Sequence, residues 1–523
     1  MSAATDALEA VLRAPDSAPR PARQRARQML SVAWPVALLV AVAGAVRFVG
    51  LDAVGFNSDE AVYAGTAASL AGDRSLEQFF PVFRAHPVLF QTLVAGVEQT
   101  LGADSDWVAR AVAAVVGIAA VLVTFALGRR LYGHGAGLIA GLFLAVMPYH
   151  VVVSRQVLLD GLMTLFVTVA LSCIVRYAES GRAAWMFAAG SAMGLAFLAK
   201  ETAVVVLGGL FAFFALTPWV TVRLRHVVAG LVPFAVLAAV HPLSQALAGK
   251  ATAGSNYLVY QLFRPENHPM TFYASVVPWA VGILVLAAAI VGLVWLRRES
   301  TWRERLLLCW AGFPIVFFTI WPVRGYQYLL PIAPVVAVLA GRTVSRLVTL
   351  RALQGRRRAA RAAVIAVATI LAVSLAIPTA QQISPSSTGS FLAGTGGVPG
   401  GREAGQWVAE EVPANAHLLT IGPSMANILQ YYGHRKVYGL SVSPNPEVRN
   451  PTYTPVRNPD RALRRGELQY LVWDSYSAGR SPSFSAKLRS LVDKYNGVPV
   501  YSGIVGSGTK EPVIVIYAVW PDP

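Results

Sequence analysis

The sequence predicts a polytopic α-helical membrane protein with a small α/β domain at its C-terminal end. Hydrophobic residues make up 55% of the 523 residues and charged residues only 14%, whereas a soluble globular domain holds about 25% charged residues. The apolar residues form long runs before residue 380. After residue 400 the composition becomes that of a soluble domain, so two differently built parts are expected.

Long apolar runs give the expected membrane spans. Crossing about 30 Å of hydrocarbon requires a helix of roughly 17 to 25 residues. About eleven runs meet this length rule. They lie at 31–50, 108–128, 135–153, 158–177, 184–199, 201–219, 227–248, 273–296, 306–322, 326–347 and 362–380. A transmembrane domain over residues 31–380 is therefore predicted, with a first external loop at 51–107.

The basic residues predict how the chain is oriented. The formal net charge is +17, and Arg residues cluster in short loops such as "GRRLYGHG", "TVRLRH" and "LRRESTWRERL". Positive residues in short loops stay in the cytoplasm. We therefore predict a multi-pass protein of the cell membrane with a disordered cytoplasmic tail at 1–30 and an uncleaved first span. The basic clusters lack aromatic platforms, so no nucleic-acid partner is expected.

The region after the last span divides into a linker and a domain. Residues 381–400 are rich in Ser, Gly and Pro and are predicted to be a flexible linker. Residues 401–523 are predicted to form an extracytoplasmic α/β domain. Its strands are expected at "HLLTIG", "LQYLVWD" and "PVIVIYAVW", and its helices at "REAGQWVAEEV", "SMANILQYYG" and "SFSAKLRSLVDKYN".

Two adjacent carboxylates, Asp59 and Glu60, follow the first apolar run in "GFNSDEAVYAG". One interpretation is structural, because acidic residues favour the first turn of a helix and Ser or Asp often caps its start. The other is functional, because the pair lies at the boundary of lipid and water. A carboxylate there meets both a lipid head group and a water-soluble molecule. These residues alone leave both interpretations open.

Further polar side chains gather at the same outer boundary. They are Arg84, His86, Arg155, Asp160, Lys200, Glu201, Arg324, Tyr326 and Tyr328. Ionisable residues at membrane depth are costly and usually face a cavity or a partner. Acidic groups beside cationic groups favour a general base with a phosphate clamp, because Arg and Lys bind phosphate oxygens by charge-assisted hydrogen bonds. Structural ion pairs, such as one between Arg155 and Asp160, are the alternative.

Several of these motifs together resemble a known family. They are "RFVGLDAVGFNSDEAVYAGTAASLAGD", "HPVLF", "SRQVLLDGLMTLFVTVAL", "GLAFLAKETA" and "GYQYLLPIAPVVAVLAG", spread over about residues 30 to 350. The chain resembles the protein-mannosyltransferase-like branch of the membrane GT-C glycosyltransferases. "HPVL" matches the family's His-Pro-Pro-Leu except at Val88. The resemblance implies a GT-C fold, a polyprenyl-phosphate-linked sugar donor, chemistry on the outer face and inversion at the anomeric carbon.

The resemblance also implies roles for five residues. Asp59 would be the catalytic base, and Glu60 and Asp160 would belong to the acceptor or metal environment. Lys200 and Arg324 would lie near the lipid phosphate. A sugar on a lipid phosphate is already activated, so the leaving phosphate needs cationic stabilisation. The acceptor hydroxyl needs a base, which one carboxylate supplies.

The outer-boundary pattern adds three residues to these groups. His86 joins the acceptor or metal environment, and Arg155 and Tyr326 join the residues expected to bind the lipid phosphate. Carboxylate oxygens and an imidazole could also hold a divalent metal ion, but no obligatory cofactor is predicted. Cys173 and Cys309 lie in apolar runs without a CxxC pattern, so a thiolate metal site is not expected.

The sequence therefore predicts an inverting glycosyltransferase of the cell envelope. It would move mannose or another hexose or pentose from a polyprenyl phosphate to an extracytoplasmic protein, glycolipid or polysaccharide acceptor. The C-terminal domain is expected to help choose or hold that acceptor. A transporter or flippase of a lipid-linked sugar is the alternative function. It would predict polar or broken helices reaching the midplane, whereas these spans are apolar at their centres.

Overall fold

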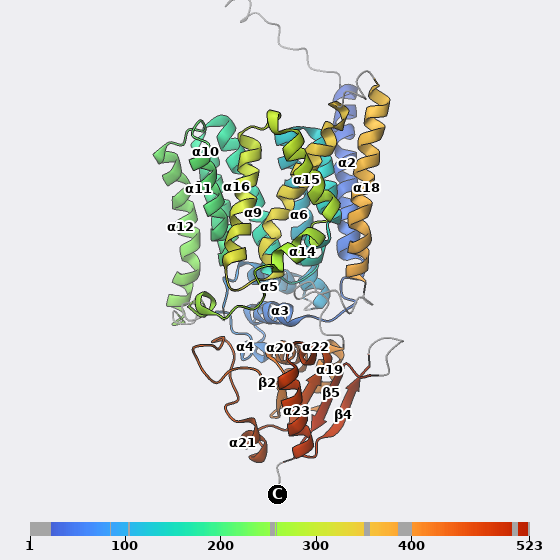
Figure 1. Ribbon diagram of the computed structural model, residues 1–523. Helices are drawn as coiled ribbons and strands as arrows, with labels where there is room; N and C mark the ends of the chain where they lie inside the picture. The colour runs from blue at the N-terminus through green and yellow to red at the C-terminus, as the bar shows by residue number, and fades with distance from the viewer. Residues whose placement is uncertain are drawn as a thin grey trace, which may run out of the picture.

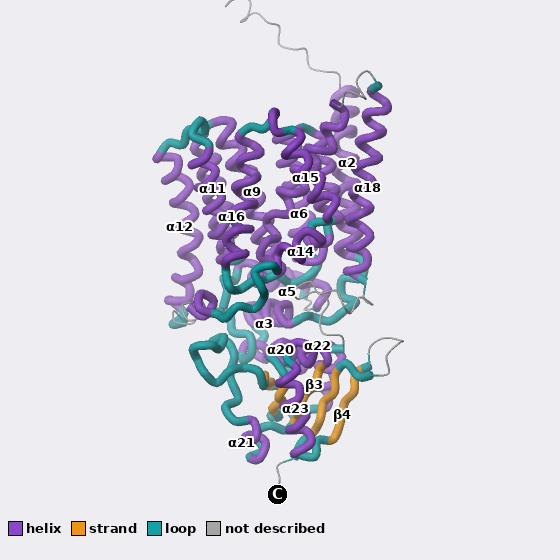
Figure 2. The backbone as a smooth tube through the Cα atoms, in the orientation of Figure 1, coloured by secondary structure: helices purple, strands orange, loops and turns teal. Residues whose placement is uncertain are grey.

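The computed structural model consists of a helical bundle with an α/β domain at one end (Figure 1). It describes residues 22–83, 85–102, 105–250, 257, 259–349, 356–384, 400–504 and 511–520, with the side chains of residues 22–33 left out. Among these residues strands occur only in the domain, and short helices and loops form a layer between the two parts (Figure 2).

The bundle contains long helices and several broken ones. They are α2 (Ala22–Phe48), α6 (Asp106–Tyr132), α7 (His134–Val146), α8 (Pro148–Val153), α9 (Leu159–Ser180), α10 (Ala183–Ala199), η1 (Glu201–Ala203), α11 (Val204–Leu216), α12 (Leu224–Leu247), α14 (Phe272–Ala280), α15 (Ile283–Trp295), η2 (Arg297–Glu299), α16 (Trp302–Ile320), η3 (Tyr326–Ile332), α17 (Ala333–Ser345), η4 (Arg346–Thr349) and α18 (Arg357–Ile383). Each of the predicted spans coincides with one of these helices or with a broken pair.

Only some of the helices described are, taken singly, long and apolar enough to cross a membrane. In the part of the chain that the structure describes, five helices meet this requirement, or six if α14 and α15 form one span. These two are bent by 96° around Gly282, whose φ of +86° favours glycine. The remaining predicted spans are shorter apolar helices or α16. That all eleven cross the membrane stays a prediction.

The position of each helix in the bundle explains its pattern of burial. Helix α17 lies at the centre, and its residues from Ala333 to Val344 are buried. Helix α12 lies at the edge (Figure 1) and exposes apolar side chains such as Val236 and Leu243. In water these side chains would be unfavourable, but lipid tails are as apolar as the side chains. The bundle therefore has the outer surface of a membrane domain.

The C-terminal domain contains a five-stranded mixed sheet in the order β2-β1-β3-β5-β4. Strand β1 is parallel to β2 and β3, whereas β5 is antiparallel to β3 and β4. The elements are α19 (Gly401–Glu411), β1 (His417–Thr420), α20 (Pro423–Gly433), β2 (Lys436–Gly439), α21 (Pro459–Arg464), β3 (Tyr470–Asp474), α22 (Ser475–Arg480), α23 (Pro482–Lys494), β4 (Val498–Gly503) and β5 (Ile514–Ala518). The three expected strands are β1, β3 and β5.

The two strands that the sequence did not reveal are the edges of the sheet. Strand β2 has only four residues, and β4 contains Pro499 and a register irregularity. Short strands and a proline are both typical of edge strands. The predicted domain boundaries also shift: α2 begins at Ala22, within the segment expected to be a tail, and α18 ends at Ile383. Most of the predicted linker lies outside the described residues.

The domain packs against the segment between α2 and α6, which was predicted to be the first external loop and folds into α3 (Ser58–Ala71), α4 (Arg74–Glu77) and α5 (Leu89–Leu101). Helix α20 lies on α3. Its Tyr432 hydroxyl accepts a hydrogen bond from the Phe56 backbone N–H at 2.7 Å and donates to Asp106 at 2.6 Å. A Cβ at Gly55 would lie 2.6 Å from the Cβ of Arg402. The loop and the domain are therefore in close contact.

Candidate active site

The start of helix α3 fixes the direction of the two adjacent carboxylates. Asn57 caps the helix, because its side-chain oxygen accepts from the backbone N–H groups of Asp59 at 2.9 Å and Glu60 at 3.0 Å. The Glu60 carboxylate accepts in turn from the backbone N–H of Asn57 at 3.1 Å. This reciprocal arrangement is a capping box. Neighbouring residues on a helix point in different directions, so Asp59 and Glu60 face different surroundings.

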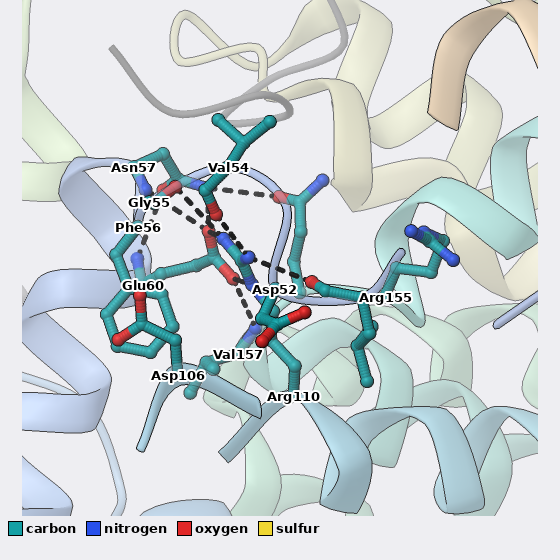
Figure 3. A network of polar contacts seen from close by, with 12 residues as sticks. Asp52, Val54, Gly55, Phe56, Asn57, Glu60, Asp106, Arg110, Arg155 and Val157 are labelled. Carbon is teal, nitrogen blue, oxygen red and sulfur yellow. Dashed lines mark hydrogen bonds and ion pairs between the residues drawn. The ribbon is translucent and has the colours of Figure 1, made fainter. Parts of the chain in front are cut away.

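Glu60 lies in a buried polar network rather than in the cavity (Figure 3). Its two carboxylate oxygens each accept from the Arg110 guanidinium at 2.7 Å, and one also accepts from the backbone N–H of Val157 at 3.1 Å. Arg110 donates further to backbone carbonyls at the start of the external loop. Glu60 therefore joins α3, α6 and the segment just before α9. This contact pattern supports the structural interpretation of Glu60.

Asp59 points into a cavity of about 650 Å³ between the bundle and the domain. Its carboxylate has no hydrogen-bond or ion-pair partner among the described residues. Burial by the surrounding protein raises the pKa of Asp59, and Lys200, His86 and Arg264 oppose that rise. A carboxylate that is accessible and has no partner is free to accept a proton.

Asp160 and Lys200 form a buried ion pair beside this cavity. The Lys200 ammonium donates to both oxygens of Asp160, at 2.9 and 2.8 Å. The ammonium also lies 4.8 Å from the centre of the Tyr328 ring, which adds a cation–π contact. Lys200 lines the cavity, although Asp160 already balances its charge. Asp160 pairs with Lys200 and not with Arg155, the partner considered from the sequence.

His86 is held at the cavity wall by a second pair. Its Nδ1 lies 2.9 Å from a carboxylate oxygen of Glu201, and its Nε2 lies 3.2 Å from the hydroxyl of Tyr257. Because a carboxylate only accepts hydrogen bonds, Nδ1 carries the proton of this contact. Gln261 donates to the Tyr257 hydroxyl at 2.6 Å, so that hydroxyl is oriented to donate to the imidazole.

The other predicted phosphate-binding residues have different positions. Arg324 and Tyr326 line the cavity, but the Arg324 guanidinium is buried and paired with Glu266. Arg155 does not line the cavity, because its guanidinium donates to four backbone carbonyls at the end of α2 and just after it. Its role is therefore to fix the chain there. Arg84 lies outside the described residues.

The residues considered for a metal do not fit a resident metal ion. Three of the four side chains are already engaged: Glu60 by Arg110, Asp160 by Lys200, and His86 by Glu201 and Tyr257. In the described ranges, no group of three or more His, Cys, Asp and Glu residues is arranged to hold a metal. Only Asp59 has free oxygen atoms, and a single carboxylate is too few ligands.

One cavity residue of interest was not singled out from the sequence. Arg264 lies in the loop between α12 and α14 and lines the cavity. It forms no ion pair with a described residue, and its guanidinium lies 5.8 Å from the centre of the Tyr260 ring. Its charge is close enough to lower the pKa of Asp59. Arg264 is therefore a cation that is available for an anionic ligand.

Comparison with known proteins identifies the fold. Residues 85–244 match the model of the family described as dolichyl-phosphate-mannose-protein mannosyltransferase. The structure is similar to the crystal structure of apo ArnT from Cupriavidus metallidurans, with a TM-score of 0.68 and 16% identity, over 94% of this chain and 98% of that chain. The chain therefore has the fold of ArnT. The resemblance seen in the sequence agrees with this fold and with the family match over residues 85–244.

Other relatives support the GT-C fold. ArnT bound to undecaprenyl phosphate matches with a TM-score of 0.64 and 17% identity, covering 92% of this chain and 97% of that chain. The Archaeoglobus fulgidus oligosaccharyltransferase, in complex with Zn and sulfate, matches with a TM-score of 0.59 and 14% identity over 93% and 73% of the two chains. YycA of Bacillus subtilis (strain 168) is 28% identical over 111 residues, which are 21% of this chain but only 16% of that protein.

Proposed function

We propose that this GT-C protein is an inverting glycosyltransferase that uses a sugar linked to a polyprenyl phosphate and an extracytoplasmic acceptor. The observation that carries the proposal is the Asp59 carboxylate, which has no partner among the described residues and faces a large cavity that cations also line. The related ArnT has been crystallised with undecaprenyl phosphate, and such a lipid supplies the donor phosphate in this proposal. The sugar is mannose or another hexose or pentose.

Asp59 acts as the general base in this mechanism. It takes the proton of the acceptor hydroxyl while the hydroxyl oxygen attacks the anomeric carbon of the donor sugar. The bond from that carbon to the phosphate oxygen breaks, and the polyprenyl phosphate leaves with the electron pair. Attack from the side opposite to the leaving group inverts the anomeric centre. Water, metal and nucleotide are not consumed in this step.

Arg264 binds the donor phosphate in this proposal. Among the cavity cations on the membrane side, Lys200 and Arg324 already have carboxylate partners, whereas Arg264 has none in the described chain. A phosphate needs cationic stabilisation as it leaves, because negative charge develops on its oxygen atoms. The paired residues still contribute to the field in the cavity, but Arg264 can bind a phosphate without first losing a partner.

A reconstituted transfer assay tests the proposed function. The purified protein in nanodiscs would receive a panel of radiolabelled polyprenyl-phosphate sugars, with membrane extract as the source of acceptor. We expect one donor to transfer its label to an extract component, with release of one polyprenyl phosphate per sugar. Donor binding without any transfer, across the whole panel and with several extracts, would contradict the proposal. Movement of intact donor across the bilayer would instead support the transporter alternative.

The pH dependence of transfer is expected to report the state of Asp59. Its pKa is raised by burial, and only the ionised form is a base. The value of kcat/KM should therefore fall as the pH falls through a pKa higher than that of an ordinary Asp. Because Arg264 lowers this pKa, Arg264→Gln should move the acid limb to higher pH. An acid limb at the same pH in both proteins would contradict this placement of the two residues.

The orientation of the chain is also a proposal. The domain and the N-terminal end of α2 lie at opposite ends of the bundle (Figure 1), and the Arg-rich short loops predict a cytoplasmic N-terminus. In a chain carrying Cys173→Ala and Cys309→Ala, we expect Ser483→Cys in the domain to react with a membrane-impermeant maleimide on intact cells. Ser180→Cys, at the exposed C-terminal end of α9, should react only after lysis. The reverse pattern would invert the orientation.

A further inference from the structure

The C-terminal domain closes the side of the cavity that faces away from the bundle, and this side is called the roof below. Two arginines of the domain line it. Arg449 lies in the loop between β2 and α21, and Arg480 is the last residue of α22. Both line the same cavity as Asp59. The domain contacts α3 directly, for example through a hydrogen bond of 3.0 Å from the Asn427 side chain to the Ser58 hydroxyl. Arg449 and Arg480 therefore line the cavity from the domain side.

Neither roof arginine has a carboxylate partner in the described part of the chain. Arg449 makes one hydrogen bond of 3.2 Å to the carbonyl of Pro444, and its Nε is buried without a hydrogen-bond partner. Arg480 donates to the Tyr476 hydroxyl at 2.9 Å, with its guanidinium 5.4 Å from the centre of that ring. Each guanidinium carries five N–H donors, so most of these donors have no protein acceptor.

The charges around the cavity are strongly unequal. Asp59 is the acidic residue that lines it among the described residues, whereas five lysines and arginines do so. Two of the five, Lys200 and Arg324, are balanced by carboxylates behind them. The other three are Arg264, Arg449 and Arg480. Guanidinium groups without carboxylate partners in one cavity favour an anionic ligand, because they bind carboxylate and phosphate through paired N–H donors.

The unbalanced cations come from both sides of the cavity. His268 also lines the cavity, and burial together with the charges of Arg480, Arg324 and Arg264 lowers its pKa. Arg264 belongs to the loop at the membrane side and Arg480 to the domain. A polyprenyl chain remains in the hydrocarbon layer, so its phosphate must stay at the membrane side. The roof arginines are therefore placed for a second anion, which belongs to the molecule that enters from outside.

We propose that Arg449 and Arg480 form a binding site for a phosphate or carboxylate group of the acceptor, and that the acceptor is an acidic saccharide. This inference rests on the proposed function and adds the chemical class of the acceptor. Tyr453 and Tyr476 line the cavity beside the two arginines. Their rings offer an apolar face together with a polar hydroxyl, which matches the mixed surface of a sugar ring. An acceptor anion held in the roof leaves the neighbouring hydroxyl facing Asp59.

Binding measurements on the full-length protein in nanodiscs test this inference without requiring turnover. The probes are mannose 6-phosphate, neutral mannose and undecaprenyl phosphate, each titrated by calorimetry. We expect mannose 6-phosphate to bind wild-type protein at least about tenfold more tightly than mannose, because charge-assisted hydrogen bonds are stronger than neutral ones. Arg449→Gln and Arg480→Gln together should remove this difference and leave undecaprenyl phosphate binding within about twofold of wild type. Arg465→Gln, an exposed arginine of the same domain, is the matched control and should change neither.

Each other outcome overturns a defined part of the inference. Equal binding of mannose 6-phosphate and mannose by wild type would remove the anion site. Loss of undecaprenyl phosphate binding in the double variant would assign the roof arginines to the donor. Tighter binding of a phosphoserine peptide than of mannose 6-phosphate would replace the saccharide by a peptide. Failure of the proposed function would appear differently, as absent transfer with all of these binding constants unchanged.

Discussion

Asp59→Asn is expected to lower kcat for sugar transfer by about 10²–10⁴-fold, the usual contribution of a general base. The amide has the size of the carboxylate but does not accept the acceptor's proton at neutral pH. Because the Asp59 carboxylate has no partner among the described residues, its loss should leave the fold intact. The measurement is the single-turnover rate with saturating polyprenyl-phosphate sugar, together with the affinity for that donor.

Asp52→Asn is the matched control for this substitution. Asp52 is an exposed carboxylate of the same external loop and does not line the cavity, so its variant should transfer sugar at the wild-type rate. Donor binding by Asp59→Asn should stay within about threefold of wild type, because the lost charge belongs to a base and not to a phosphate ligand. Equal transfer rates for wild type and Asp59→Asn would remove Asp59 as the base.

The sequence indicated that these polar residues gather at one end of the bundle, but it did not indicate how they pair. Asp59, His86 and Lys200 do line one cavity, as the shared side of the membrane indicated. Glu60 and Arg155 do not, because each is engaged by groups distant in the chain. Apolar runs establish the depth of a residue, whereas the direction of its side chain depends on tertiary packing. Pairing across the bundle is therefore not visible in one sequence.

Arg264 is a cavity residue that the sequence analysis did not single out, also because pairing is not visible in one sequence. In the sequence it lies two residues before Glu266, so the two charges appear to balance locally. In the structure Glu266 pairs with Arg324 instead, which leaves Arg264 available. The helices were easier to predict, because a long apolar run has few alternatives in a membrane. The bend between α14 and α15 was missed, since Gly282 lies within an uninterrupted apolar run.

Glu60→Gln is expected to destabilise the protein by about 3–5 kcal/mol, the usual cost of removing one partner from a buried ion pair. The substitution leaves the Arg110 guanidinium buried with its charge uncompensated, and it weakens the acceptor for the backbone N–H groups of Asn57 and Val157. The start of α3 should then lose its fixed position, and Asp59 with it. The measurement is the thermal unfolding midpoint in detergent, alongside the transfer rate.

A second pair of measurements separates this structural role from a direct role in the reaction. Glu179→Gln breaks the partly exposed pair with Arg130 and should cost at most about 1 kcal/mol, because water screens such pairs. If Glu60 instead binds the acceptor, Glu60→Gln would lose transfer while its unfolding midpoint matched that of Glu179→Gln. Loss of both stability and transfer is the expected result, since the carboxylate that follows the base in the sequence holds the base in place from behind the cavity wall.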